Sequence, residues 1–491
     1  MSILPIIGCA LLLTIFFRND EEGNSLWWCN HISLMSILII SIIVLMKSKS
    51  MKRSNDNISI SIMFLIASFG TVAAAYRNLG NTSVYAMCVT LSTPALLFFL
   101  KSKKTFLKTI VYALFITTFI LVANSGSRTG IIAMSISGIF ILSTHLRTKY
   151  LFLIIGIIFI LLASALFFTK EESSTGRRFI LERTIEMVYE KPFGWGKNGF
   201  EANYMNFQAN YFKHKHNENA EMLADNVKHP LNEFLKITVD YGIQTLFILI
   251  LFVIFILRYL ILSKDTAHKT MLHFLIILLV WSCFSYPFSL SFVQLMIMAY
   301  TIPVIPRIEY SPKQSIKTTI LTFIFFILCV EVKAGIDDWK WNRAIEEFKN
   351  GNKKVATGIF DNYNSFLIER GNLLFSLATI EYNNKDYAQC IKVCNECKEY
   401  ISSYELEIII ANSYMFLKDF NKAEEHYLKA GYMCPNRFIP LYQRFKIYKQ
   451  LGETEKMQTL GNNILKKKIK VPSKKIDIIL NNVKYELSHL Q

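Results

Sequence analysis

Long apolar runs alternate with short polar loops along residues 1–332, and each run can cross, or nearly cross, about 30 Å of hydrocarbon. The pattern predicts an all-α membrane helix bundle of about 11 spans. The spans are expected near residues 2–17, 31–46, 58–76, 84–100, 108–123, 130–145, 150–168, 243–262, 270–286, 289–305 and 318–332. The alternation breaks in two polar regions, residues 169–242 and 333–491.

The basic residues of the short loops show a one-sided distribution. Five alternate loops hold 16 Lys and Arg against 3 Asp and Glu: residues 47–57, 101–108, 146–150, 258–269 and 306–317. The intervening short loops hold only Arg18, Arg77 and Arg128. By the positive-inside rule, the basic loops are cytoplasmic, and residues 169–242 and 333–491 lie on the outer face. The net charge of +17 therefore sets orientation, and no nucleic-acid partner is expected.

The composition excludes several classes of protein. Hydrophobic residues make up 52% of the chain and charged residues only 19%, whereas soluble domains carry about a quarter charged residues. A soluble enzyme, a disordered chain and a disulfide-stapled secreted module are all excluded.

Residues 333–491 contain an internal repeat. Lys385–Tyr387 recurs as Lys418–Phe420, a period of 33 residues, and Pro435 closes the second copy. Three cysteines align with small or aromatic residues of that copy: Cys390, Cys394 and Cys397 with Ala423, Tyr427 and Ala430. The alignment favours helix packing over an iron–sulfur cluster. The region resembles tetratricopeptide repeats and predicts an α-solenoid of about three repeats, a fold suited to binding a protein partner.

The candidate catalytic residues lie near the end of the outer loop, beginning with His229. Pro230 is favoured at the first helical position, so a helix is expected to begin there with His229 as its cap and to stop at Gly242. On such a helix His229, Asn232 and Glu233 share one polar face, beside the membrane. Either His229 or Glu233 could act as a base.

Three arginines are candidate ligands for an anionic substrate group. Arg128 lies between two spans, in an outer loop of small residues, and a guanidinium can bind phosphate oxygens bidentately. Arg177 and Arg178 open a helix in the outer loop. Helical spacing places Arg177 on the less polar face and Arg178 on a face shared with Glu182 and Glu186.

Residues 194–199 satisfy the glycine pattern G-x-G-x-x-G but follow no predicted strand. A nucleotide site needs a strand, the glycine turn and a helix in succession. We therefore expect a structural glycine turn.

The ordered set of motifs over roughly residues 60–310 resembles the O-antigen ligase/polymerase superfamily. This superfamily includes lipopolysaccharide O-antigen ligases, O-antigen polymerases and bacterial protein O-oligosaccharyltransferases. The motifs are Arg128 after Ser-Gly-Ser, Ser174–Arg177, Pro192-x-Gly194-x-Gly196, His229 and Asn232–Leu235. Family members often have Asn directly after the His, whereas Pro230 and Leu231 intervene here.

The resemblance implies transfer of a glycan from an undecaprenyl-pyrophosphate carrier to a hydroxyl of lipid A–core, a glycan end or a protein. It implies the periplasmic face of a bacterial inner membrane, with no cofactor or metal. Residues 1–332 would form the transferase domain, with the catalytic loop at 169–242, and residues 333–491 a separate periplasmic domain. The alternative is a transporter or flippase of the lipid-linked glycan with a docking tail, but transporters place ionisable residues deep within their spans.

Overall fold

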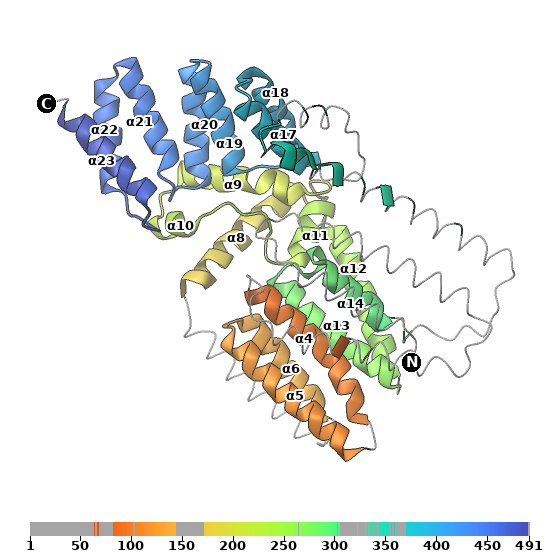
Figure 1. Ribbon diagram of the computed structural model, residues 1–491. Coiled ribbons are helices and arrows are strands. Elements are labelled where there is room, and N and C mark those ends of the chain that lie inside the picture. The colour runs from red at the N-terminus through yellow and green to blue at the C-terminus, as the bar shows by residue number, and fades with distance from the viewer. Residues whose placement is uncertain are drawn as a thin grey trace. The chain divides into compact units, whose positions relative to one another are not determined.

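The computed structural model describes residues 82–101, 104–143, 171–263, 265–301, 303–304 and 370–489, with scattered positions between 63 and 67 and between 322 and 358. Helices are the regular structure of these residues, which contain no strand, so the all-α class is confirmed. The chain divides into two compact units (Figure 1). The first unit comprises Met1–Thr169, Leu231–Phe234 and Phe247–Asp338; the second comprises Lys170–Pro230, Leu235–Leu246 and Trp339–Gln491.

The first unit is a bundle of apolar helices. Its members are α4 (Thr82–Phe98), α5 (Thr105–Asn124), α6 (Arg128–Ser143), most of α12 (Ile243–Leu262), α13 (Thr266–Phe284) and α14 (Ser291–Thr301), with 3₁₀ turns at Phe99–Lys101 and Pro287–Ser289. Helices α4, α6 and α13 pack on one another around a core that includes Met87, Met134 and Trp281. Gly130 allows the close approach, because a Cβ there would lie 2.8 Å from that of Ala86.

Three helices of the described residues are long and apolar enough to cross a membrane: α5, α12 and α13. About half of the apolar stretch of α13 is buried among other helices, whereas little of α12 is buried. Shorter apolar helices correspond to the expected spans near 84–100, 130–145 and 289–305. The spans expected at 2–17, 31–46 and 150–168 lie outside the described residues, as do nearly all of 58–76 and 318–332. The chain is a multi-pass membrane protein, and the number of 11 spans stays a prediction.

The second unit joins the outer loop to the tail. The loop contributes α8 (Glu171–Glu190), α9 (Gly199–His214), α10 (Glu218–Leu223) and α11 (Glu233–Tyr241). The tail contributes α17 (Arg370–Asn383), α18 (Tyr387–Cys397), α19 (Tyr404–Phe416), α20 (Phe420–Met433), α21 (Ile439–Leu451), α22 (Thr454–Lys466) and α23 (Lys474–Ser488). Each tail helix packs on the next in chain order, as Figure 1 shows.

The 33-residue period corresponds to successive helix pairs. Lys385 and Lys418 both adopt positive φ, 66° and 62°, and each precedes an aspartate that caps the next helix. Gly452, with φ 71°, makes the corresponding turn before α22. The three aligned cysteines are fully buried on α18, as are their counterparts on α20, so the expectation of helix packing is confirmed. The assignment to tetratricopeptide repeats stays a prediction.

One apolar core runs through both parts of the second unit. Phe200, Tyr204 and Met205 of α9 are buried against Tyr404 of α19 and Met433 of α20. The predicted transferase domain includes the outer loop, whereas the contacts group residues 170–230 with the tail. The division into a transferase domain, residues 1–332, and a separate domain, residues 333–491, stays a prediction.

Candidate functional site

Arg128 is the first residue of α6, directly after a tight turn. Gly126 forms the turn with φ 74°, and Ser127 caps the helix by accepting the N–H of Gly130 at 3.2 Å. Arg128 is half-buried. The N-terminal end of a helix carries a partial positive charge, so the guanidinium adds to a positive potential that suits an anion.

Asn232 and Glu233 are anchored at the start of α11 by groups of the first unit. The Nδ2 of Asn232 donates to the carbonyl of Cys283 at 3.1 Å. Glu233 is 4% exposed, and its Oε1 accepts the backbone N–H of Phe288 at 3.0 Å. These bonds tie the start of α11 to the end of α13 and the turn that follows it.

The expected start of this helix is wrong by three residues. Helix α11 begins at Glu233 rather than at Pro230, and Leu231 has φ 56°, which no α-helix contains. His229 is therefore no helix cap, and it does not share a helical face with Asn232 and Glu233. The contacts of Glu233 and Asn232 with residues about fifty positions away fix the start instead. The expected end is confirmed, because α11 stops at Tyr241 and Gly242 has φ 88°.

His229 lies in the non-helical segment between α10 and α11, within the second unit. It is partly buried. Burial lowers the pKa of its imidazole below 6.5, and the charges of Lys236 and Lys228 lower it further. The ring is therefore neutral at pH 7 and able to accept a proton.

Arg177 and Arg178 are both exposed on α8. Arg178 forms the expected ion pair, with its Nε 2.9 Å from the Oε1 of Glu182. Glu186 instead pairs with Arg183, whose Nη2 lies 2.9 Å from its Oε1.

Arg183 is a buried arginine that the sequence analysis did not single out. Its guanidinium stacks 4.2 Å from the ring centre of Tyr211 and 5.3 Å from that of Phe179. The spacing of three residues between Arg183 and Glu186 indicates the ion pair from sequence alone. The stacking on Tyr211 could not be predicted in this way, because it depends on the packing of α9 against α8. These contacts account for Arg183 as a residue that fixes α8 against α9.

The glycine turn packs on the end of α11. Trp195 donates its backbone N–H to Val239 at 2.8 Å, and Gly196 donates to Asp240 at 2.9 Å. The buried carboxylate of Asp240 accepts the N–H of Phe200 at the start of α9. The turn thus joins α8, α9 and α11, as the structural interpretation of G-x-G-x-x-G requires.

The bundle interior of the first unit holds a polar cluster that the sequence analysis missed. His273 of α13 is buried, with Nε2 3.0 Å from the Oγ of Ser137 on α6, and its ring stacks on Phe140 at 4.2 Å. Ser137 also lies 2.9 Å from the Oγ1 of Thr93 on α4. The cluster links three helices by contacts between polar side chains.

The sequence-predicted site residues are divided between the two units. Arg128, Asn232 and Glu233 belong to the first, and Arg177, Arg178 and His229 to the second. Each unit thus contains at least one arginine and one candidate base. Across the described residues, no three His, Cys, Asp or Glu side chains gather as a metal site.

Part of the chain is similar to a known protein family. A model of the O-antigen ligase family matches residues 113–250. The match supports the resemblance to the O-antigen ligase/polymerase superfamily over this segment. A comparison with curated proteins gave no match.

Proposed function

We propose, from the O-antigen ligase family segment at residues 113–250, that this membrane protein transfers a glycan from an undecaprenyl-pyrophosphate carrier to an acceptor hydroxyl on the outer face of a bacterial inner membrane. The observation that carries the proposal is that one matched segment contains all six candidate residues: Arg128, Arg177, Arg178, His229, Asn232 and Glu233.

His229 is the proposed general base. The acceptor oxygen attacks the anomeric carbon, the bond from that carbon to the pyrophosphate oxygen breaks, and the hydroxyl proton passes to the imidazole. Partial burial and two nearby lysines keep the ring neutral. A neutral imidazole can act as a base near neutral pH, and such catalysis contributes about 10²–10⁴-fold in rate.

Arg128 and Arg177 are the proposed ligands of the departing pyrophosphate. The leaving group gains negative charge as the bond breaks, and fixed cationic donors stabilise that charge more than the ground state. The position of Arg128 at a helix N-terminus supports this role. Arg178 is the weaker candidate because it already pairs with Glu182.

Glu233 is the alternative base, and its hydrogen bond favours an anchoring role. Replacement by Gln keeps an oxygen that can accept the N–H of Phe288 but removes the capacity to accept a proton. Glu233→Gln should therefore retain transfer, whereas Glu233→Ala should lower the yield of folded protein. If Glu233→Gln is inactive and His229→Ala remains active, the carboxylate is the base and the assignment to His229 is wrong.

The pH dependence of transfer provides a second test. The proposed base must be unprotonated, and its pKa is lowered from 6.5. The rate constant at saturating donor should be constant near pH 7 and fall as the pH drops through a midpoint below 6.5. Purified protein, lipid-linked glycan and acceptor would be assayed between pH 4.5 and 8. A midpoint above 6.5 contradicts the assignment.

The loss of bidentate phosphate binding is the most direct test of the leaving-group role. Arg128→Lys keeps the charge but loses the planar pair of donors. We expect the barrier to rise by about 2–4 kcal/mol, by analogy with lost oxyanion donors. Transfer by Arg128→Lys at the wild-type rate would refute this role.

The flippase alternative gains one observation, the buried His273 in a membrane helix. Its contacts with Ser137 and Phe140 also describe an interhelical hydrogen bond. His273→Gln should leave glycan transfer intact in detergent if the site lies in the outer loop. Movement of lipid-linked glycan across vesicles that depends on His273, without glycan transfer, would favour the flippase.

A further inference from the structure

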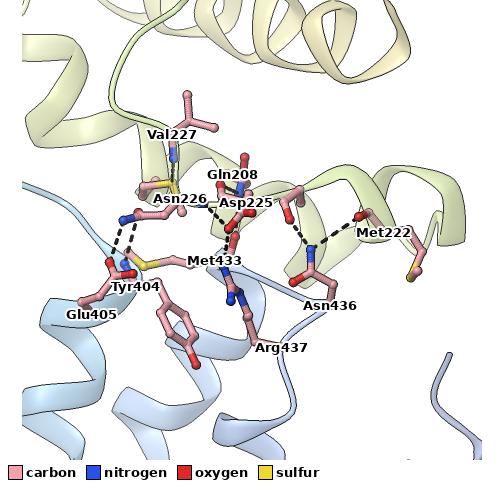
Figure 2. Close-up of polar contacts among 12 residues, drawn as sticks. Gln208, Met222, Asp225, Asn226, Val227, Tyr404, Glu405, Met433, Asn436 and Arg437 are labelled. Atoms are coloured by element: carbon pink, nitrogen blue, oxygen red, sulfur yellow. Dashed lines mark hydrogen bonds and ion pairs between the residues drawn. The ribbon is translucent and has the colours of Figure 1, made fainter. Parts of the chain in front are cut away.

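Residues 224–230, here termed the linking segment, run without helix from the end of α10 to His229 and Pro230. The side chains of Asp225 and Asn226 and several backbone groups of the segment bond to other parts of the second unit. Figure 2 shows that their partners come from α9 and from the tail. The segment that carries the proposed base is thus held by residues far from it in sequence.

The tail contacts the segment from the turn between α20 and α21. The Nδ2 of Asn436 donates to the carbonyl of Ala224, and both residues are buried. The Nη2 of Arg437 lies 2.8 Å from the Oδ1 of Asp225. Burial alone would raise the pKa of Asp225, but the hydrogen bond from Arg437 lowers it below its usual value, so the pair is ionised at neutral pH.

The N-terminus of α19 provides a second attachment. Asn226 donates from Nδ2 to the Oε2 of Glu405 at 2.6 Å, and its Oδ1 accepts the N–H of Tyr404 at 3.5 Å. Both side-chain groups of Asn226 are therefore bound to the tail, three residues before His229 (Figure 2).

Gln208 of α9 joins the segment and the tail through one buried amide. Its Nε2 donates to the carbonyl of Asp225 at 3.0 Å and to that of Met433 at 2.6 Å. The side chain of Gln208 is fully buried. One buried amide therefore binds both the linking segment and the tail.

We propose that the tail is part of the catalytic unit, and that Glu405, Asn436 and Arg437 are positioning residues that hold the linking segment and so fix His229. This inference rests on the proposed function, in which His229 is the base. It assigns the tail a role in the reaction itself, in addition to any partner that it binds.

The first measurement is hydrogen exchange in the linking segment, which reports local opening rather than overall stability. Asn436→Ala leaves the buried carbonyl of Ala224 without that donor, and hydrogen exchange in peptides covering 224–230 should rise by roughly tenfold or more in the full-length protein. Arg437→Ala, which removes a half-exposed ion pair, should give roughly a two- to fivefold rise. Arg444→Ala is the matched control, since it breaks another arginine–carboxylate pair of the tail, with Glu424 at 3.0 Å.

Transfer kinetics separate positioning from a general loss of structure. Asn436→Ala and Arg437→Ala should lower kcat with little change in KM for the donor. Their pH midpoints should move up toward 6.5, because His229 becomes more solvated. Arg444→Ala should change neither the exchange of the linking segment nor the pH midpoint. If Asn436→Ala does not fold, Arg437→Ala and Asp225→Asn test the attachment of the segment to the tail through the ion pair between these two residues.

Two results would overturn the inference. One is unchanged exchange in residues 224–230 in the Asn436 and Arg437 variants. The other is faster exchange with wild-type kcat and pH midpoint. The exchange measurement needs no substrate, so it tests the attachment of the segment separately from the proposed function. If the exchange changes as expected but the wild-type protein transfers no glycan, the proposed function is wrong.

Discussion

Gly194 and Gly196, in the turn before α9, allow the effect of close packing on a glycine to be separated from the effect of its backbone conformation. Gly194 and Gly196 have similar backbone conformations, with φ 99° and 92°. A Cβ on Gly194 would lie 2.7 Å from the carbonyl oxygen of Asp240 and 2.7 Å from the backbone nitrogen of Gly242. A Cβ on Gly196 would have nothing within 4 Å. The same substitution therefore adds backbone strain at both sites and a collision at only one.

The expected magnitudes follow from these distances. Positive φ costs an L-residue about 1–2 kcal/mol, which is the whole expected effect of Gly196→Ala. Gly194→Ala must also move the turn away from α11, which breaks the bonds from Trp195 to Val239 at 2.8 Å and from Gly196 to Asp240 at 2.9 Å. Losing two backbone hydrogen bonds costs about another 1–3 kcal/mol. The total for Gly194→Ala is therefore about 2–5 kcal/mol.

Hydrogen exchange at the amide of Trp195 and at that of Ile243, which donates to Pro192 at 2.9 Å, measures the local opening. The rate should rise by roughly fivefold to thirtyfold in Gly196→Ala, and by roughly a further tenfold in Gly194→Ala. Gly126→Ala, at φ 74° with open space around it in the other unit, controls for strain elsewhere. Equal rates in the Gly194 and Gly196 variants would refute the close-packing argument.

Three further predictions address the arginines, the cysteines and the orientation. Arg177→Ala should reduce transfer about as severely as loss of Arg128. Arg178→Ala, which breaks an exposed ion pair, should change the free energy of unfolding by no more than about 0.5 kcal/mol and leave transfer measurable. Equal transfer rates in the Arg177 and Arg178 variants would refute this distinction. Cys390→Ala introduces the residue that occupies the equivalent position one repeat later, and it should lower the free energy of unfolding by about 1 kcal/mol in denaturant titration. Complete unfolding of this variant would contradict a role in packing alone. A reporter active only outside the cytoplasm should work when fused after Gln491 and fail near Lys104; the reverse result would place the tail inside the cell.

The sequence alone determined the features that depend on local periodicity. Apolar runs predicted membrane helices because a span must satisfy its backbone internally and face lipid or other helices, and α5, α12 and α13 meet that criterion. The period of 33 predicted the burial of Cys390, because equivalent positions in stacked repeats face the same core. Gly242 ended α11 as expected, since a glycine tolerates positive φ at a helix end.

The tertiary structure decided the features that depend on distant partners. Pro230 favoured a helix start on local grounds, but the bond from Phe288 to Glu233 and the positive φ of Leu231 moved that start to Glu233. The outer loop packs with the tail because α9 and α20 share one apolar core, although their sequences are separated by the spans of the first unit. Arg437 became a partner of Asp225 through the same packing. No periodicity within either segment encodes such a pair, because its energy arises only when two distant surfaces are brought together.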